Sequence, residues 1–285
     1  MYRKQWTIIS IAVVIGLAWM ALCHDDSFSR LQKRQIIRIG YAVEAPYAFI
    51  DKEGKVTGES PETAKAIVSR LGIQHIEWRL SEFGSLIKDL QSGKIDVIAT
   101  GMFINAERAE VVGFSEPVFH VRQGMLVQRG NPKQIHSYSK ALELDDFKIA
   151  VIDGAIEEKI LLKQGFSSSD LIQVPDAMSG RLAVEQGVAD GLALSSPTIT
   201  WMAAQNLLGT TEAVVPFEQP TIYNEEKIGF GAFVFRKEDK QLRKKWNDVQ
   251  KTFIGSPKHL KLFGQFGFTP HELPGNISTK EILAK

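Results

Sequence analysis

The stretch ATGMFINAER places an aromatic ring and a fixed positive charge at the end of an apolar segment. Phe103 follows Gly101 by two positions, and Arg108 follows Phe103 by five. A guanidinium presents two parallel N–H donors to a carboxylate and stays charged at any working pH, and the face of an aromatic ring attracts a cation. The alternatives are a core aromatic and a surface arginine paired with Glu107 or Glu110.

The segments before this stretch predict the elements that position it. Extended, β-rich patterns predict strands at 36–42 and 75–80, and the apolar run KIDVIAT predicts a third at 94–100. Ser60 followed by Pro61 is typical of a helix N-cap and first helical position, and EFGSLIKDLQSG predicts a second helix. The order strand, helix, strand, helix, strand is typical of an α/β domain with parallel neighbours.

Glu44, Phe83 and Phe103 lie just past or between the ends of these predicted strands. Ligands of parallel α/β sheets bind outside the carboxyl ends of the strands. We therefore expect these three side chains to lie near a ligand.

A second α/β unit follows, in FKIAVIDGAIEEKILLKQG and LIQVPDAMSGRLAVEQGVADGLALSS. Long extended segments at 120–130 and 226–239 flank it, and the helical pattern of QLRKKWNDVQKTF returns the chain. We predict two α/β lobes joined by two extended hinge strands, with residues 36–124 and 226–285 in lobe 1 and residues 125–225 in lobe 2. Ligands favour the cleft between such lobes, and hinge closure around them is a known mode.

The first 23 residues differ from the rest. Arg3 and Lys4 precede a long uncharged apolar run, which is the pattern of an export signal. The run is near the lower length limit of a membrane span, so a retained anchor is the alternative. Cys23 stands where a lipoprotein cysteine would stand. We expect export, with cleavage, lipidation at Cys23 and anchoring as the three outcomes.

Composition disfavours several other functions. A net charge of +1 on 285 residues provides no basic surface for nucleic acid. The six histidines include no close pair with ligand spacing, so we expect no metal site. The single cysteine allows no intrachain disulfide. We also expect no cofactor, because GFGAF lies inside a predicted strand and lacks the third glycine of a dinucleotide fingerprint.

Three long frames resemble the family 3 periplasmic solute-binding proteins, the receptors of polar amino-acid ABC importers: IRIGYAVEAPYAFIDKEGKVTGESPE, FGSLIKDLQSGKIDVIATGMFINAERAEVVGFSEP and GFGAFVFRKED. The resemblance covers nearly the whole chain after Ile36. It implies the type II periplasmic-binding-protein fold, with the ligand cleft between two α/β lobes. It also implies a monomeric periplasmic receptor whose partners are a small ligand and the permease subunits of an ABC transporter.

The blocks EAPYAF, EFGSLI, ATGMFINAER and FGFTPHELPG are most similar to the ectoine- and hydroxyectoine-binding branch of the family. This resemblance implies that Arg108 clamps the ligand carboxylate. It also implies that three rings form a cage around a delocalised cation: Tyr47, Phe83 and Phe103. Glu44 would then accept a charge-assisted hydrogen bond from the cation.

The same resemblance assigns Gly101, Ala155, Ile156 and Ser195 to the ligand site. Receptors for ordinary α-amino acids hold the ammonium with an aspartate five residues after the position of Asp190, where this chain has Ser195. A serine cannot neutralise an ammonium, which argues for a different cation. Ile156 matches a position where a small or hydroxyl side chain would meet the carboxylate, so backbone N–H groups near Ala155 remain as donors.

Two alternatives come from other function classes. Some relatives of the family are cyclohexadienyl-dehydratase-like enzymes, which need a general acid over the ligand. Glu44 is the only cleft carboxylate that the sequence places, and no second acid or histidine stands at a matching position, so we expect no catalytic residue. We do not expect a membrane-anchored sensor domain, because no kinase or other output domain follows the C-terminal STKEILAK. The sequence predicts a receptor for ectoine, hydroxyectoine or a similar small zwitterion, with a polar amino-acid receptor as the nearest alternative.

Overall fold

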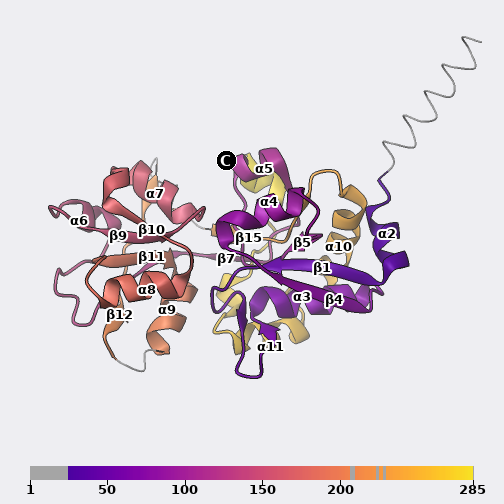
Figure 1. The fold of residues 1–285 in the computed structure, drawn as a ribbon, viewed down its shortest axis with the longest axis horizontal. Helices are drawn as coiled ribbons and strands as arrows, with labels where there is room; N and C mark the ends of the chain where they lie inside the picture. Colours follow the sequence, from indigo (N-terminus) through magenta and orange to yellow (C-terminus); the bar gives the residue numbers. More distant parts are fainter. Residues whose placement is uncertain (1–24, 206–208, 223–224, 227–228, 285) are drawn as a thin grey trace, which may run out of the picture.

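The chain forms two α/β lobes that lie side by side and are joined by two extended segments (Figure 1). The computed structural model describes residues 25–205, 209–222, 225–226 and 229–284. The predicted two-lobe fold is confirmed. The expected export segment, with Cys23, lies outside the described residues. Within the described ranges, no helix is both long enough and apolar enough to cross a bilayer.

Lobe 1 is built on a five-stranded sheet in the order β4-β1-β5-β16-β6. Its strands are β1 (Ile36–Tyr41), β4 (His75–Leu80), β5 (Val97–Ile98), β6 (Val112–Phe114) and β16 (Val234–Arg236). Strand β1 runs parallel to β4 and β5, whereas β16 runs antiparallel to β5 and β6. The carboxyl ends of β1, β4 and β5 therefore meet at one edge of the sheet.

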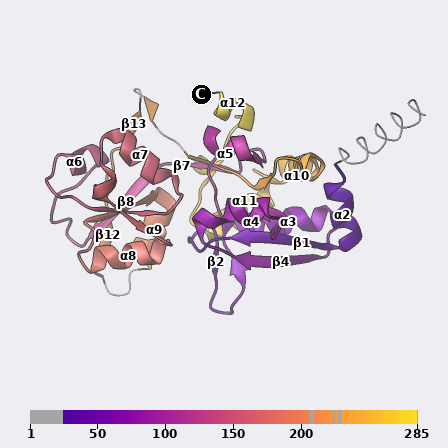
Figure 2. The ribbon, with the colours of Figure 1, turned by 45° about the horizontal axis from the view of Figure 1, so that its top comes forward.

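Helices cover both faces of this sheet (Figures 1 and 2). They are α2 (Ser27–Arg34), α3 (Glu59–Arg70), α4 (Leu86–Gln91), α5 (Ala106–Val111), α10 (Lys240–Phe253), α11 (Pro257–Gln265) and α12 (Thr279–Leu283), with 3-10 turns η1 (Phe83–Ser85) and η3 (Pro270–Glu272). A hairpin of β2 (Phe49–Ile50) and β3 (Val56–Thr57) lies beside them. Trp246 of α10 is fully buried against Phe233 and Phe235, so the C-terminal helices belong to the core of lobe 1.

Lobe 2 has a second five-stranded sheet in the order β10-β9-β11-β8-β12. Its strands are β8 (Gln123–Gln128), β9 (Ile149–Ile152), β10 (Leu171–Val174), β11 (Gly191–Ser195) and β12 (Thr211–Ala213). Its helices are α6 (Tyr138–Leu142), α7 (Ile156–Gln164), α8 (Ala177–Glu185) and α9 (Ser196–Ala204), with the 3-10 turn η2 (Ser168–Asp170) and a hairpin of β13 (Thr221–Ile222) and β14 (Glu225–Glu226). The carboxyl ends of the parallel strands β9 and β11 face the same edge as the start of the antiparallel strand β8.

The two lobes are connected by an antiparallel pair, β7 (Phe119–Val121) and β15 (Gly229–Gly231). Each strand leads into a sheet: β7 is followed by β8 of lobe 2, and β15 is followed by β16 of lobe 1. The predicted extended segments at 120–130 and 226–239 are therefore each divided between a hinge strand and a sheet strand.

The predicted N-cap at Ser60 is wrong. Helix α3 begins at Glu59, and Gly58 is its N-cap, with φ at 121°. A Cβ atom at Gly58 would lie 2.4 Å from the backbone oxygen of Tyr47. The chain therefore needs glycine at the cap for both its dihedral angle and its close approach, and Ser60 instead donates to the Glu59 carboxyl group.

Candidate functional site

The carboxyl edge of the lobe 1 sheet brings together most of the predicted lobe 1 residues. Glu44 follows β1, Phe83 begins η1 after β4, Phe103 follows β5 and Arg108 lies in α5. The topology alone places them there, because parallel strands end at the same edge of a sheet. The opposing edge of lobe 2 carries the start of α7 and of α9.

Arg108 is buried, with 8% of its surface exposed. Asn105 caps α5 by accepting from the Arg108 backbone N–H at 2.8 Å. The guanidinium donates from Nη1 to the Phe103 carbonyl at 2.8 Å, and its central carbon lies 5.5 Å from the Phe83 ring centroid. Burial lowers the pKa of Arg108 to about 10, so the side chain remains charged at neutral pH. Burial argues against the alternative of a surface arginine.

The second nitrogen of Arg108 reaches the other lobe. Nη2 donates to the carbonyl of Gly154 at 2.8 Å. A Cβ atom at Gly154 would lie 3.0 Å from the Cα of Gly84 in lobe 1, so the two backbones approach as closely as glycines permit. Glu107 and Lys159 form an ion pair across the same boundary. The lobes are therefore in direct contact beside Arg108.

Two hydrogen bonds between side chains connect the lobes further along the interface. Tyr47 donates from its hydroxyl to Ser195 Oγ at 2.9 Å. Thr198 donates from Oγ1 to Glu44 Oε1 at 2.7 Å, and the Ser195 and Thr198 hydroxyls lie 3.2 Å apart. Ser195 caps α9 and Thr198 lies in its first turn, so this one helix N-terminus makes both contacts.

The three predicted cage rings have different surroundings. The Tyr47 ring stacks on Phe119 at 5.1 Å, and a Cβ atom at Gly101 would lie 2.7 Å from it. The Phe103 ring is buried against hinge residue Gly229. Phe83, by contrast, packs against apolar clusters of both lobes and beneath the Arg108 guanidinium. Phe83 is thus the ring most directly between the lobes, and the other two lie in the lobe 1 core beside the hinge.

Glu44 is a partly buried acid at this interface. Burial raises the pKa of Glu44 to about 7, the hydrogen bond from Thr198 opposes the rise, and the charge of Glu157 adds to it. Burial therefore favours the neutral form of Glu44, and a nearby cation would favour its charged form.

On the lobe 2 side, Ala155 caps α7 and is buried, and Ile156 begins the helix. The Ile156 side chain packs against the apolar cores of both lobes, so it offers contact area and no hydrogen bond. Asp190 has a structural role, because it accepts from the Lys148 backbone N–H and pairs with Lys133.

The sequence reasoning missed Glu157, the second residue of α7. Its side chain is only 4% exposed, and it accepts a hydrogen bond from Gln123. Gln123 in turn accepts from the hydroxyl of the buried Tyr138 at 3.4 Å. Burial raises the pKa of Glu157 to about 7, against the attraction of Arg108. Acids in a first helical turn are normally exposed and favourable to the helix dipole, so EEK gave no sign of burial.

Thr198 was also missed, although its position offered a signal. It lies three residues after Ser195, so the two hydroxyls fall within the first turn of one helix. Among the described residues, no group of three or more His, Cys, Asp or Glu side chains is arranged to hold a metal ion.

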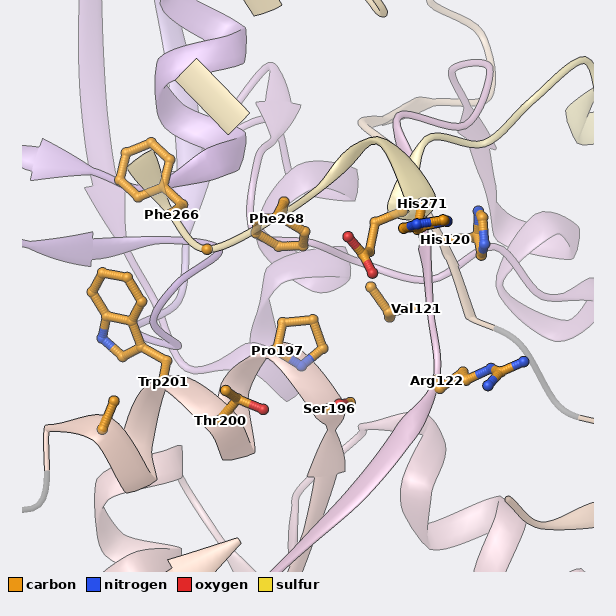
Figure 3. A pocket seen from close by; sticks show the side chains of 13 residues that line it. His120, Val121, Arg122, Ser196, Pro197, Thr200, Trp201, Phe266, Phe268 and His271 are labelled. Atoms are coloured by element: carbon orange, nitrogen blue, oxygen red, sulfur yellow. The ribbon is translucent and has the colours of Figure 1, made fainter. Parts of the chain in front are cut away.

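A cavity of about 640 Å³ lies beside the hinge rather than at these charged groups (Figure 3). Its lining includes Pro197 and Trp201 of α9, Arg122 after β7, and Phe268 and His271 of lobe 1. None of the predicted site residues lines it. Because carboxylates, guanidinium and hydroxyls converge at the lobe interface, we place the candidate site there and not in this cavity.

Comparison with known proteins identifies the family. Residues 37–268 match the model of the bacterial extracellular solute-binding proteins, family 3, and the chain belongs to this family. A probable amino-acid ABC transporter periplasmic-binding protein, y4tE of Sinorhizobium fredii, is 31% identical over 282 residues, covering 97% of this chain and 93% of that protein. The arginine-binding extracellular protein ArtP of Bacillus subtilis is 26% identical over 253 residues, covering 87% and 92% of the two chains.

Among solved structures, the crystal structure of EhuB in complex with hydroxyectoine is similar with a TM-score of 0.82 and 27% identity, covering 92% of this chain and 99% of that chain. The relatives are mostly binding proteins, although a membrane-bound lytic murein transglycosylase is also among them. The chain is therefore a periplasmic, amino-acid-type solute-binding protein with the type II fold. Members of this class bind small ligands and deliver them to ABC permeases.

Proposed function

We propose that this receptor binds ectoine, hydroxyectoine or a similar small zwitterion between its two lobes. The observation that carries the proposal is the pair Arg108 and Glu44, which bear opposite charges at one edge of lobe 1 and each bond to lobe 2. A solute that bridges both lobes favours the closed state, because it binds that state more tightly.

The anionic end of the solute belongs on Arg108. A carboxylate there accepts two parallel N–H bonds and replaces contacts that the guanidinium otherwise makes to backbone carbonyls. The cationic end belongs near Glu44, where a delocalised N–H donor gains a charge-assisted hydrogen bond. Ring faces add to the attraction for such a cation, and Tyr47, Phe83 and Phe103 remain the proposed rings.

The second candidate is a receptor for a polar α-amino acid. Glu157 favours it, because a buried carboxyl group at the edge of lobe 2 supplies the negative charge that Ser195 lacks. The amino-acid-type relatives support this candidate as strongly as EhuB supports the first.

We further propose that the protein acts as an exported, monomeric receptor and has no catalytic residue. Glu157 provides the second acid that a dehydratase would need, so the chemistry of the bound solute must be checked directly. After incubation, mass spectrometry should recover the solute unchanged.

Calorimetric titration with ectoine, hydroxyectoine, glycine betaine, proline, arginine and glutamine tests the function. We expect ectoine or hydroxyectoine to bind with a Kd on the order of micromolar or tighter, equivalent to about 8 kcal/mol or more. Binding of an α-amino acid with no response to ectoine would replace the first candidate by the second. Recovery of a chemically altered solute by mass spectrometry would show that the protein is an enzyme.

A further inference from the structure

Two charged side chains of lobe 1, Arg108 and Glu44, lie at the proposed solute site, and the buried acid Glu157 lies at the start of α7 on the facing lobe. The charges of Glu44 and Glu157 repel each other, and Glu157 is attracted to Arg108, so the three groups are within electrostatic reach. Arg108 and Glu157 are both more than nine-tenths buried. Little solvent screens their interaction.

The position of Glu157 is fixed by lobe 2. Its carboxyl group is held by Gln123, which pairs with Ser195 across β8 and β11. Gln123 is held in turn by the Tyr138 hydroxyl. Glu157 therefore lies at the same sheet edge as Ser195, on the side of lobe 2 that faces Glu44 and Arg108.

When all three groups are ionised, the site carries one net negative charge. Burying an uncompensated charge is costly, and a protein site avoids the cost by pairing the charge or by taking up a proton. A solute with one net positive charge compensates it, whereas a net-neutral zwitterion leaves it unchanged.

We infer that Glu157 determines the charge specificity of the solute site: solutes with a net positive charge bind without a proton, and net-neutral zwitterions bind together with one. The inference rests on the proposed function in so far as the solute lies at Arg108 and Glu44. It applies to ectoine and to a neutral amino acid alike, because only the net charge of the solute matters.

The other titratable groups that face Glu157 do not change this balance. Burial raises the pKa values of Tyr47 and Tyr138 well above 10, so both hydroxyls stay neutral. Burial also raises the pKa values of Glu44 and Glu157 to about 7, so one proton on this pair is available near neutral pH. The pair titrates as a unit, and the proton belongs to both carboxyl groups.

The test is calorimetry in two buffers with different ionisation enthalpies, from about pH 6 to about pH 8.5, which measures the protons bound per solute. The solutes are ectoine and glutamine, which are net-neutral, and arginine, which is net-positive. For a neutral solute we expect uptake that approaches one proton above about pH 7, with Kd rising up to about tenfold per pH unit. For arginine we expect no uptake.

Glu157→Gln should abolish the uptake and flatten the pH dependence of Kd for neutral solutes. Glu158→Gln is the matched control, because Glu158 lies next in α7 and its side chain accepts from Gln173 instead. It should behave like the unmodified protein. Uptake that persists in Glu157→Gln, or neutral solutes that bind with no uptake in the unmodified protein, would overturn the inference.

Failure of the proposed function gives a different result. If ectoine does not bind but glutamine or arginine does, the ectoine assignment fails and the proton count with those solutes still tests Glu157. If no solute binds, thermal unfolding replaces the titration. A carboxyl group whose pKa is raised by folding stabilises the folded state at low pH. This stability is lost as the pH rises through about 7. Burial also raises the pKa values of Glu44 and Glu59 to about 7, so Glu157→Gln should lose less stability over this range than the unmodified protein. A pH-independent difference between the two proteins would overturn the inference.

Discussion

The two sides of the lobe interface carry different chemistry. Lobe 1 presents charges of both signs, Arg108 and Glu44, on segments that follow parallel strands. Lobe 2 presents two hydroxyls and one acid from the first turns of α7 and α9: Ser195, Thr198 and Glu157. Under the proposed function, lobe 1 orients a zwitterion, while lobe 2 bonds to lobe 1 and, through Glu157, sets the net charge of the site.

The largest effect should come from removing the cation of lobe 1. Arg108→Ala leaves a solute carboxylate without a partner in a desolvated site, so we expect Kd to rise by about a hundredfold or more. Arg108→Lys keeps the charge but loses the planar guanidinium. Its Kd should lie between those of the unmodified protein and Arg108→Ala. Calorimetry measures Kd for both variants. An unchanged Kd in Arg108→Ala would show that Arg108 does not bind the solute carboxylate.

Removing the lobe 1 acid should cost less. Glu44→Gln keeps the size and the acceptor oxygen for Thr198, but it loses a charge-assisted bond to the solute cation. We expect Kd to rise by about tenfold to a hundredfold, from a bond of about 1.5–3 kcal/mol. Equal affinity of this variant for ectoine would show that Glu44 only connects the lobes.

Substitution of Phe103 tests whether its ring contacts the solute or only packs in the core of lobe 1. If its face meets the solute cation, Phe103→Leu should weaken binding by about twofold to thirtyfold, since such contacts contribute about 0.5–2 kcal/mol. Phe235→Leu is the control, because Phe235 is a fully buried ring of the same core. It should lower the unfolding temperature and leave Kd unchanged. Equal Kd in both variants would assign Phe103 to the core alone.

The smallest effect on binding is expected far from the cleft. Burial lowers the pKa of His259 to about 4, so folding keeps the imidazole neutral. Its stabilising contribution is present above about pH 6.5 and is lost as the pH falls toward about 4. His259→Asn should reduce this acid dependence of the unfolding temperature, with no change in Kd at neutral pH. An altered Kd would show that the core of lobe 1 around His259 affects solute binding.

Lobe 1 was more predictable from the sequence than lobe 2. Strand patterns placed Glu44, Phe83 and Phe103 near the strand ends of one sheet, because parallel topology fixes where strand ends meet. The role predicted for Arg108 came from the family resemblance. Burial of Glu157 depended on Gln123 and Tyr138, which lie far from it in the sequence. Such contacts follow from tertiary packing, and local patterns do not encode them.

The sequence also did not predict that the three rings have different surroundings. Tyr47, Phe83 and Phe103 share a sheet edge, but packing against Phe119 and Gly229 decides where two of the rings point. The N-cap at Gly58 was missed because the close approach to Tyr47 is a tertiary contact.

The most direct test is a crystal structure of the protein with the solute that binds most tightly in the titration. We predict a solute enclosed between the lobes, with its carboxylate about 3 Å from the Arg108 nitrogens and its cationic N–H groups at hydrogen-bonding distance from Glu44. A solute bound in the cavity beside Trp201, or one that contacts neither Arg108 nor Glu44, would contradict the account.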